Sequence, residues 1–209
     1  MAFDGIVTRA VARGLAEVLT SGRINKIYQP GRDELVFFIH SREGRKKLYA
    51  SCNNHHPGIF LTEEEFSNPQ EPPGFCMLLR KHLQSNRILS ITQRGAERII
   101  EVTVDSRDEM GFSARKKLIV EIMGRHSNII LVDEESGKIM DSIKRVSPEV
   151  NRARQILPGQ SYIYPPLQNK IPFDRIEDKD LIVKTDDPAG ELLSRIQGIS
   201  PIIARIRRS

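Results

Sequence analysis

The stretch EIMGRHSNIILVD, residues 121–133, places five polar or turn-forming residues between two apolar runs. The run IILV after the break is typical of a buried strand, and the glycine and asparagine that bound GRHSN favour a tight turn. The stretch therefore predicts two strands joined at a corner. Three interpretations of the polar tip remain: a plain turn, a catalytic cluster, or a contact surface for a charged partner.

The residues before this corner alternate between short strand-like runs and turns. Apolar residues recur at spacings of three and four from Ile6 to Leu19, which predicts a helix with Asp4 as its N-cap. FCMLLRKHL, residues 75–83, predicts a second helix whose basic C-terminal half suits the helix dipole. We expect a β-rich α+β fold of antiparallel strands with flanking helices, the strands lying near residues 23–30, 34–40, 46–51, 58–62, 87–93, 97–106, 115–123, 128–133 and 138–146.

The composition changes near residue 157. LPGQSYIYPPLQNKIP, residues 157–172, is rich in proline and predicts an extended connector. ELLSRIQGISPIIARI, residues 191–206, predicts a helix, a glycine turn and a second helix. One helical hairpin buries its apolar face poorly, so we expect an N-terminal fragment of a longer protein. The predicted division is a first domain at residues 1–175, then a linker and the start of a helix-hairpin-helix domain at 176–209.

The bulk properties favour a polyanionic partner over a membrane. The 209 residues carry a formal net charge of +5, with a charged fraction of 28%. Asp4, Arg9 and Arg13 interrupt the apolar region that a signal peptide needs, and no stretch is apolar enough to span a bilayer. We therefore expect a cytoplasmic protein with no membrane partner.

The candidate enzymatic sites are poorly supported by the sequence. Adjacent residues of an extended segment point to opposite faces, so His126 and Ser127 form no local base–nucleophile pair. His55 and His56 stand in a loop without metal-ligand spacing, Cys52 and Cys76 form no CxxC motif, and no phosphate-binding glycine loop occurs. We expect a non-enzymatic protein without metal or cofactor.

Basic residues give a stronger signal. Arg80 and Lys81 lie in the second predicted helix, and further clusters surround residues 42–47, 87–98, 115–117 and 144–154. Such clusters neutralise phosphates and gain by counterion release. Tryptophan is absent and aromatic residues are only 6%, which favours recognition of a folded RNA by shape and backbone.

The dipeptide Glu97–Arg98 follows Gly95, which allows a bend before a strand. One interpretation is a surface ion pair, which contributes little stability. The other is a recognition pair, in which the arginine binds a phosphate or a base edge and the glutamate accepts a hydrogen bond from an exocyclic amine.

Six motifs together carry a resemblance to a known family. In this order, MAFDGIVTRAV, GRINKIYQP, PPGFCMLLRKHL, ITQRGAERIIEV, EIMGRHSNIILVD and LPGQSYIYPPLQNK resemble the N-terminal domain of the NFACT family. The resemblance covers essentially the whole chain. It implies a fold similar to the N-terminal domain of formamidopyrimidine-DNA glycosylases, a β-sandwich with flanking helices followed by a helical module.

The resemblance also implies a function in ribosome-associated quality control. Family members bind a large ribosomal subunit obstructed by peptidyl-tRNA, recruit tRNA (alanine tRNA in bacteria) and direct C-terminal alanine tailing of the stalled chain. The acidic–Arg dipeptide of the family matches Glu97–Arg98, with glutamate where many members have aspartate. Arg125, His126, Ser127 and Asn128 match a family signature. We therefore expect tRNA-binding residues at Glu97, Arg98, Arg125, His126, Ser127, Asn128, Arg80 and Lys81.

Two alternatives remain. Older names in the family suggest a surface adhesin that binds fibronectin. The glycosylase-like fold suggests base excision, but those enzymes attack with an N-terminal proline, and residues 2 and 3 here are Ala2 and Phe3. The polar tip at residues 124–128 is expected either to face tRNA or to pack against another domain.

Overall fold

The computed structural model describes residues 3–107, 110–166, 168–183 and 185–205. Helix α1 (Gly5–Leu19) opens the chain, and the Asp4 carboxylate caps it by accepting the Val7 N–H at 2.8 Å. Helix α2 (Gly74–Leu83) separates two groups of strands. In the described chain these strands are β1 (Arg23–Tyr28), β2 (Glu34–Ser41), β3 (Gly44–Ser51), β4 (Gly58–Leu61), β5 (Arg87–Gln93), β6 (Ile99–Arg107), β7 (Ser113–Glu121), β8 (Asn128–Asp133) and β9 (Ile139–Ser142).

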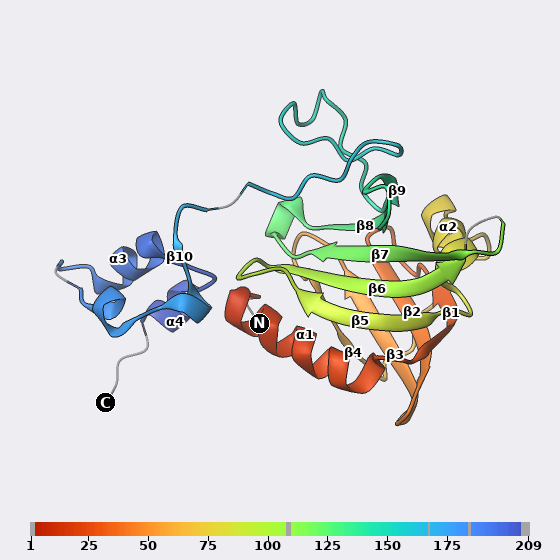
Figure 1. Ribbon diagram of the computed structural model, residues 1–209, viewed down its shortest axis with the longest axis horizontal. Helices are drawn as coiled ribbons and strands as arrows, with labels where there is room; N and C mark the ends of the chain where they lie inside the picture. Colours follow the sequence, from red (N-terminus) through yellow and green to blue (C-terminus); the bar gives the residue numbers. More distant parts are fainter. Residues whose placement is uncertain (1–2, 108–109, 167, 184, 206–209) are drawn as a thin grey trace.

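The nine strands form one antiparallel sheet in the order β4-β3-β2-β1-β5-β6-β7-β8-β9. Within the described residues β1 pairs with β5 through Arg23 and Arg87 alone, whereas β6 and β7 pair along their whole length. The sheet therefore bends between β1 and β5, and β1–β4 pass behind β5–β7 at a steep angle (Figure 1). The predicted β-rich α+β fold with flanking helices is confirmed, and its two layers belong to one continuous sheet.

The core lies between these two layers. Alternate residues of the strands point inward, so Phe37 of β2 and Ile100 of β6 are buried in the same cluster. Leu15 of α1 and Leu79 of α2 complete this cluster from the two helices. Burial of these apolar surfaces supplies the main favourable contribution to folding.

The outer face of β6–β9 is covered by residues 154–164, which we call the strap. Both Nη atoms of Arg154 donate to the Glu121 carboxylate, which is fully buried, and the Tyr162 hydroxyl donates to the same carboxylate at 2.6 Å. The Tyr164 hydroxyl donates to Glu101 at 2.6 Å. The strap encloses a second apolar cluster of Ile99, Ile119, Ile130, Val132, Ile139 and Ile156.

A small C-terminal module follows the strap. The predicted helix, glycine turn and helix are present as α3, Gly198 and α4, and the domain boundary at residue 175 stays a prediction. The elements of the module are β10 (Ile171–Pro172), the 3-10 helices η2 (Phe173–Arg175) and η3 (Asp178–Leu181), α3 (Pro188–Arg195), β11 (Ile196–Gln197) and α4 (Pro201–Ala204).

The module docks against the start of α1. The Gly5 N–H donates to the Gly198 carbonyl at 2.8 Å. Arg9 donates to Asp174 at 2.7 Å and to the Gly95 carbonyl at 2.8 Å, and its guanidinium lies 4.5 Å from the centroid of the Phe173 ring. Arg9 therefore joins α1, the turn after β5 and the module.

No helix in the described ranges combines the length and the apolar character needed to cross a membrane.

We predict that Arg154→Met lowers the free energy of unfolding by about 3–5 kcal/mol, because the Glu121 carboxylate would stay buried without its cation. Chemical denaturation measures this change. Arg145→Met is the matched control: the Arg145 side chain is 62% exposed and pairs with Asp141 on the surface, so less than about 1 kcal/mol should be lost. Equal losses in the two variants would contradict the buried pairing.

We predict that Gly5→Ala destabilises the docked module. A Cβ atom at Gly5 would lie 2.4 Å from the Ala96 carbonyl oxygen, and such overpacking costs about 1–3 kcal/mol or more. A Cβ atom at Gly14 in the same helix would meet nothing within 4 Å, so Gly14→Ala should stabilise the protein by about 0.5–1 kcal/mol. Urea unfolding tests both, and a neutral Gly5→Ala would refute the close approach.

Candidate functional site

The register of β6 with β7 brings the two candidate motifs together. Ile99 pairs with Glu121, so the residue before Ile99 lies beside the residue after Glu121. The Ile122 N–H donates to the Arg98 carbonyl at 2.8 Å. Two segments more than twenty residues apart in the sequence thereby meet at one end of the sheet, where β6 begins and β7 ends.

Arg98 is an exposed cation at this meeting point. Within the described chain no hydrogen bond or salt bridge holds its guanidinium, and none joins it to Glu97. Arg98 borders two hollows: a cleft of about 390 Å³ against the module and a groove of about 1150 Å³ along the edge of β4. Its five N–H donors are therefore available to a ligand in either hollow.

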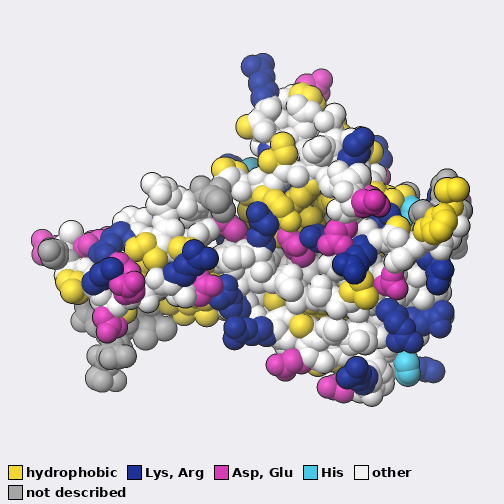
Figure 2. All heavy atoms as spheres, in the orientation of Figure 1, with side chains coloured by type: hydrophobic (Ala, Val, Ile, Leu, Met, Phe, Trp, Pro, Cys, Tyr) yellow, Lys and Arg dark blue, Asp and Glu magenta, His cyan; other side chains and the backbone are white. Residues whose placement is uncertain are grey.

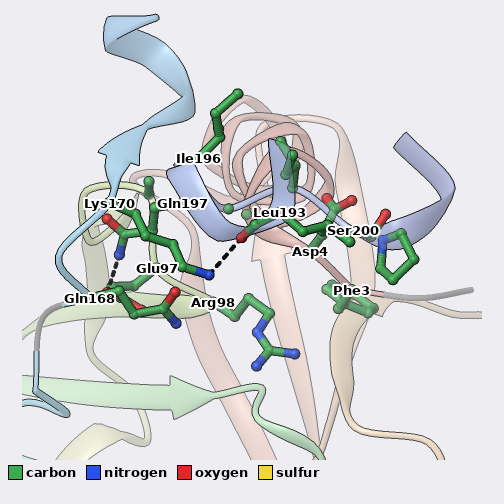
Figure 3. A pocket seen from close by; sticks show the side chains of 15 residues that line it. Phe3, Asp4, Glu97, Arg98, Gln168, Lys170, Leu193, Ile196, Gln197 and Ser200 are labelled. Carbon is green, nitrogen blue, oxygen red and sulfur yellow. Dashed lines mark hydrogen bonds between the residues drawn. The ribbon is translucent and has the colours of Figure 1, made fainter. Parts of the chain in front are cut away.

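Glu97 points away from Arg98, toward the module (Figure 3). Its carboxylate accepts a hydrogen bond from the Gln197 side chain, which is buried, and its carbonyl accepts one from Gln93 at 2.7 Å. Burial raises the pKa of Glu97, while the charges of Arg98 and Arg94 and the bond from Gln197 act in the opposite direction. No ion pair joins Glu97 to Arg98 among the described residues, so the predicted surface ion pair is wrong. Both residues line the cleft against the module, and the recognition pair stays a prediction. Glu97 also fastens the turn to the module through Gln197.

The corner between β7 and β8 is a single 3-10 turn, η1 (Gly124–His126), entered at Gly124 with φ of 56°. Ser127 and Asn128 are buried and hold this turn from inside. The Ser127 hydroxyl accepts the Met123 N–H at 2.8 Å, and the Asn128 amide donates to the Lys144 carbonyl at 2.7 Å. Direct contact of Ser127 and Asn128 with tRNA conflicts with this burial, so any part they have in binding is through the shape of the turn.

Arg125 and His126 form the exposed part of the corner. The Arg125 Nε donates to the His126 Nε2 at 3.0 Å, so the two side chains are aligned with each other. The Ser127 hydroxyl accepts its backbone hydrogen bond on the inner side of the turn, and no hydrogen bond joins Ser127 to His126 among the described residues.

Aromatic and histidine side chains form a wall of the groove that Arg98 and Gly124 also line. Tyr49 and Phe60 are paired across β3 and β4, and Phe66 stacks on Tyr49 with ring centroids 5.2 Å apart and an interplanar angle of 10°. His55 and His56 are exposed at one end of the groove. The sequence predictions missed this wall; alternation in β3 and β4 places Tyr49 and Phe60 on the outer face, but Phe66 comes from irregular chain.

Arg80 and Lys81 do not lie at this groove. Ser106, near the far end of β6, donates to the His82 carbonyl at 2.7 Å, whereas Arg98 precedes the first residue of β6. Helix α2 therefore lies at the opposite end of the sheet (Figure 1). The predicted tRNA contact at Arg80 and Lys81 stays a prediction, separate from the groove.

No group of three or more His, Cys, Asp or Glu side chains in the described ranges is arranged to hold a metal ion. Cys52 and Cys76 are both buried free thiols. Burial raises the pKa of Cys52 to about 12, which leaves this thiol protonated and unreactive at neutral pH.

Known proteins resemble the whole chain. The family described as "NFACT N-terminal and middle domains" matches residues 4–206. The Rqc2 homolog RqcH of Bacillus subtilis is 41% identical over 98% of the chain, which spans 37% of the length of that relative. The human ribosome quality control complex subunit NEMF is 31% identical over 64% of the chain, which spans 12% of NEMF.

The fold has a solved counterpart. The N-terminal domain of fibronectin-binding protein PavA from Streptococcus pneumoniae superposes with a TM-score of 0.90 and 39% identity. The alignment covers 97% of the chain and 77% of the PavA chain. Family match, sequence identity and fold agree along the same residues, and the chain therefore belongs to the NFACT family, in the region of its N-terminal and middle domains.

Proposed function

We propose that this chain is the tRNA-binding module of a ribosome-associated quality-control factor. The factor would bind obstructed large ribosomal subunits and direct C-terminal alanine tailing of the stalled chain, and the module would present alanine tRNA without catalysing a reaction itself. The names of RqcH and NEMF, which concern ribosome quality control, support this role. Because the chain spans 37% of the RqcH relative, tailing would belong to the whole protein.

The observation that carries the proposal is the exposed guanidinium of Arg98 where the two motifs meet, which has no hydrogen bond or ion pair to any described residue. A planar guanidinium with free donors suits bidentate contact with a phosphate. Arg125 and His126 add exposed donors at the corner, and Tyr49, Phe60 and Phe66 offer ring surface to an unpaired base. The groove thus combines a phosphate contact at Arg98 with aromatic surface for stacking.

In this proposal Glu97 and Arg98 have different tasks. Arg98 contacts RNA, and Glu97 fixes the turn that carries Arg98 by accepting the bond from Gln197. In the family dipeptide, Arg98 would then contact the RNA and Glu97 would hold Arg98 in place. A shorter aspartate at position 97 would reach less far toward Gln197, so the glutamate matches the spacing of this chain.

Two other functions are weaker candidates. Fibronectin binding is suggested by the name of PavA. Detection of the native protein on intact cells, together with fibronectin capture by the purified chain, would favour the adhesin.

Base excision would need a proline amine at position 2. Ala2 lies outside the described residues, and its identity alone argues against that chemistry.

We predict that Arg98→Ala weakens binding of deacylated alanine tRNA about tenfold to a hundredfold, as expected for loss of a charged hydrogen bond of about 1.5–3 kcal/mol. Fluorescence anisotropy at several salt concentrations measures the affinity. The dependence of log K on log salt should also become shallower by about 0.9, which is the share of one phosphate.

Three variants accompany this test. Arg152→Ala removes an exposed arginine that precedes the strap and has no partner among the described residues, and it should leave the affinity near that of the wild type. Glu97→Gln keeps the side-chain oxygen that Gln197 needs, so it should retain binding, whereas Glu97→Leu should weaken it. An Arg98→Ala variant that binds like Arg152→Ala would remove Arg98 from the site.

A further inference from the structure

Two sequence motifs that the groove does not use meet at the other end of the sheet. GRINKIYQP, residues 22–30, forms β1, and PPGFCMLLRKHL, residues 72–83, forms α2. The Arg80 Nε donates to the Ile27 carbonyl at 2.8 Å, and its guanidinium lies 5.2 Å from the centroid of the Tyr28 ring. Arg80 is therefore fixed against β1 with its charge over an aromatic face.

A hollow of about 430 Å³ lies beside this contact, on the outer face of β1–β3. Lys26 pairs with Phe38 across the strands, while their neighbours Ile27 and Phe37 point into the core. The rings of Tyr28 and Phe38 meet edge to face with centroids 5.7 Å apart. The hollow is lined by Asn25, Lys26, Tyr28, Phe38, Ile39, Arg45 and Lys46.

Two of the three cations that line the hollow have no compensating carboxylate among the described residues. Lys26 and Arg45 are exposed, and neither has a hydrogen bond or ion pair in the described part of the chain. Lys46 pairs with Glu43 at 3.2 Å, a residue outside the lining. No carboxylate is among the described residues that line the hollow. Figure 2 shows Lys and Arg side chains gathered over the end of the molecule where β1 and the β2–β3 hairpin lie.

An acidic segment separates this hollow from the Arg98 groove. The Lys47 ammonium, on the outer face beside Phe38, donates to the Glu64 carbonyl at 2.6 Å and to the Glu65 carboxylate at 2.8 Å. Glu64 then lines the groove. A single polyanionic strand running from the groove to the hollow would have to cross the carboxylates of residues 63–65, so the two surfaces suit two separate strands.

We propose that the hollow is a second RNA contact, which binds the backbone of ribosomal RNA on the large subunit while the groove holds tRNA. Lys26 and Arg45 would each neutralise a phosphate, and the Tyr28–Phe38 edge would take an unpaired base or a ribose. This inference rests on the proposed function, because that function supplies a ribosomal partner in addition to tRNA. It would make the domain a bridge between two RNAs.

The test measures the binding of two variants to each of two RNA partners. Lys26→Glu with Arg45→Glu, and Arg98→Ala, are each measured against purified large ribosomal subunits by sedimentation and against deacylated tRNA by anisotropy. The hollow variant should weaken subunit binding at least about tenfold and reduce its salt dependence by about 1.8, the share of two phosphates, with tRNA affinity retained. Arg98→Ala should show the reverse pattern.

The control Arg13→Glu with Arg152→Glu makes the same charge change at two exposed arginines away from the hollow. Lys26→Gln with Arg45→Gln repeats the test without new carboxylates, and unfolding curves verify that each variant folds. Ultraviolet crosslinking of the wild-type chain on subunits should join β1 or β2 to ribosomal RNA.

Four outcomes would overturn the inference: no binding of the chain to subunits, equal losses in the control, loss of tRNA affinity in the hollow variant, or crosslinks from β1 and β2 to ribosomal protein alone. If Arg98→Ala leaves tRNA binding intact, the proposed function fails instead. The two failures are therefore distinguishable.

Discussion

The antiparallel register between β6 and β7 is the constraint on which the functional surface depends. The hydrogen bond from the Ile122 N–H to the Arg98 carbonyl places the turn after β5 against the corner before β8. A shift of one residue would turn every side chain of β6 to the opposite face of the sheet. Arg98 would then lose its place beside the corner, and the groove would lose one wall. Register is thus the link between the fold and the proposed recognition of tRNA.

At this end of the sheet, buried polar groups support the structure, and exposed groups are left to contact a partner. Glu121, the last residue of β7, forms an ion pair with Arg154 and accepts a hydrogen bond from Tyr162 of the strap. Ser127 and Asn128 bond the backbone of the corner, and Glu97 bonds Gln197 of the module. Because the hydrogen bonds of these groups are all made within the protein, they specify one arrangement of this end of the sheet. The exposed Arg98, Arg125 and His126 remain available for a partner.

Periodicity and turn chemistry were enough to predict the elements but could not predict how distant residues pair. The α1 helix, its Asp4 cap and the strand–corner–strand at residues 121–133 depend on neighbours in the sequence, and the structure confirms them. The partner of Glu97 lies 100 residues away, so the sequence suggested the adjacent Arg98 instead. Burial of Ser127 and the distance of Arg80 from the groove likewise follow from packing of the sheet, which no local pattern encodes.

The central claim is that the end of the sheet that carries both motifs binds tRNA. Hydrogen–deuterium exchange of the chain with and without saturating deacylated tRNA tests this most directly. The account predicts that backbone amides of residues 94–98 and 123–127 become protected together. Protection confined to α2 or to the C-terminal module, with both motifs unaffected, would contradict it.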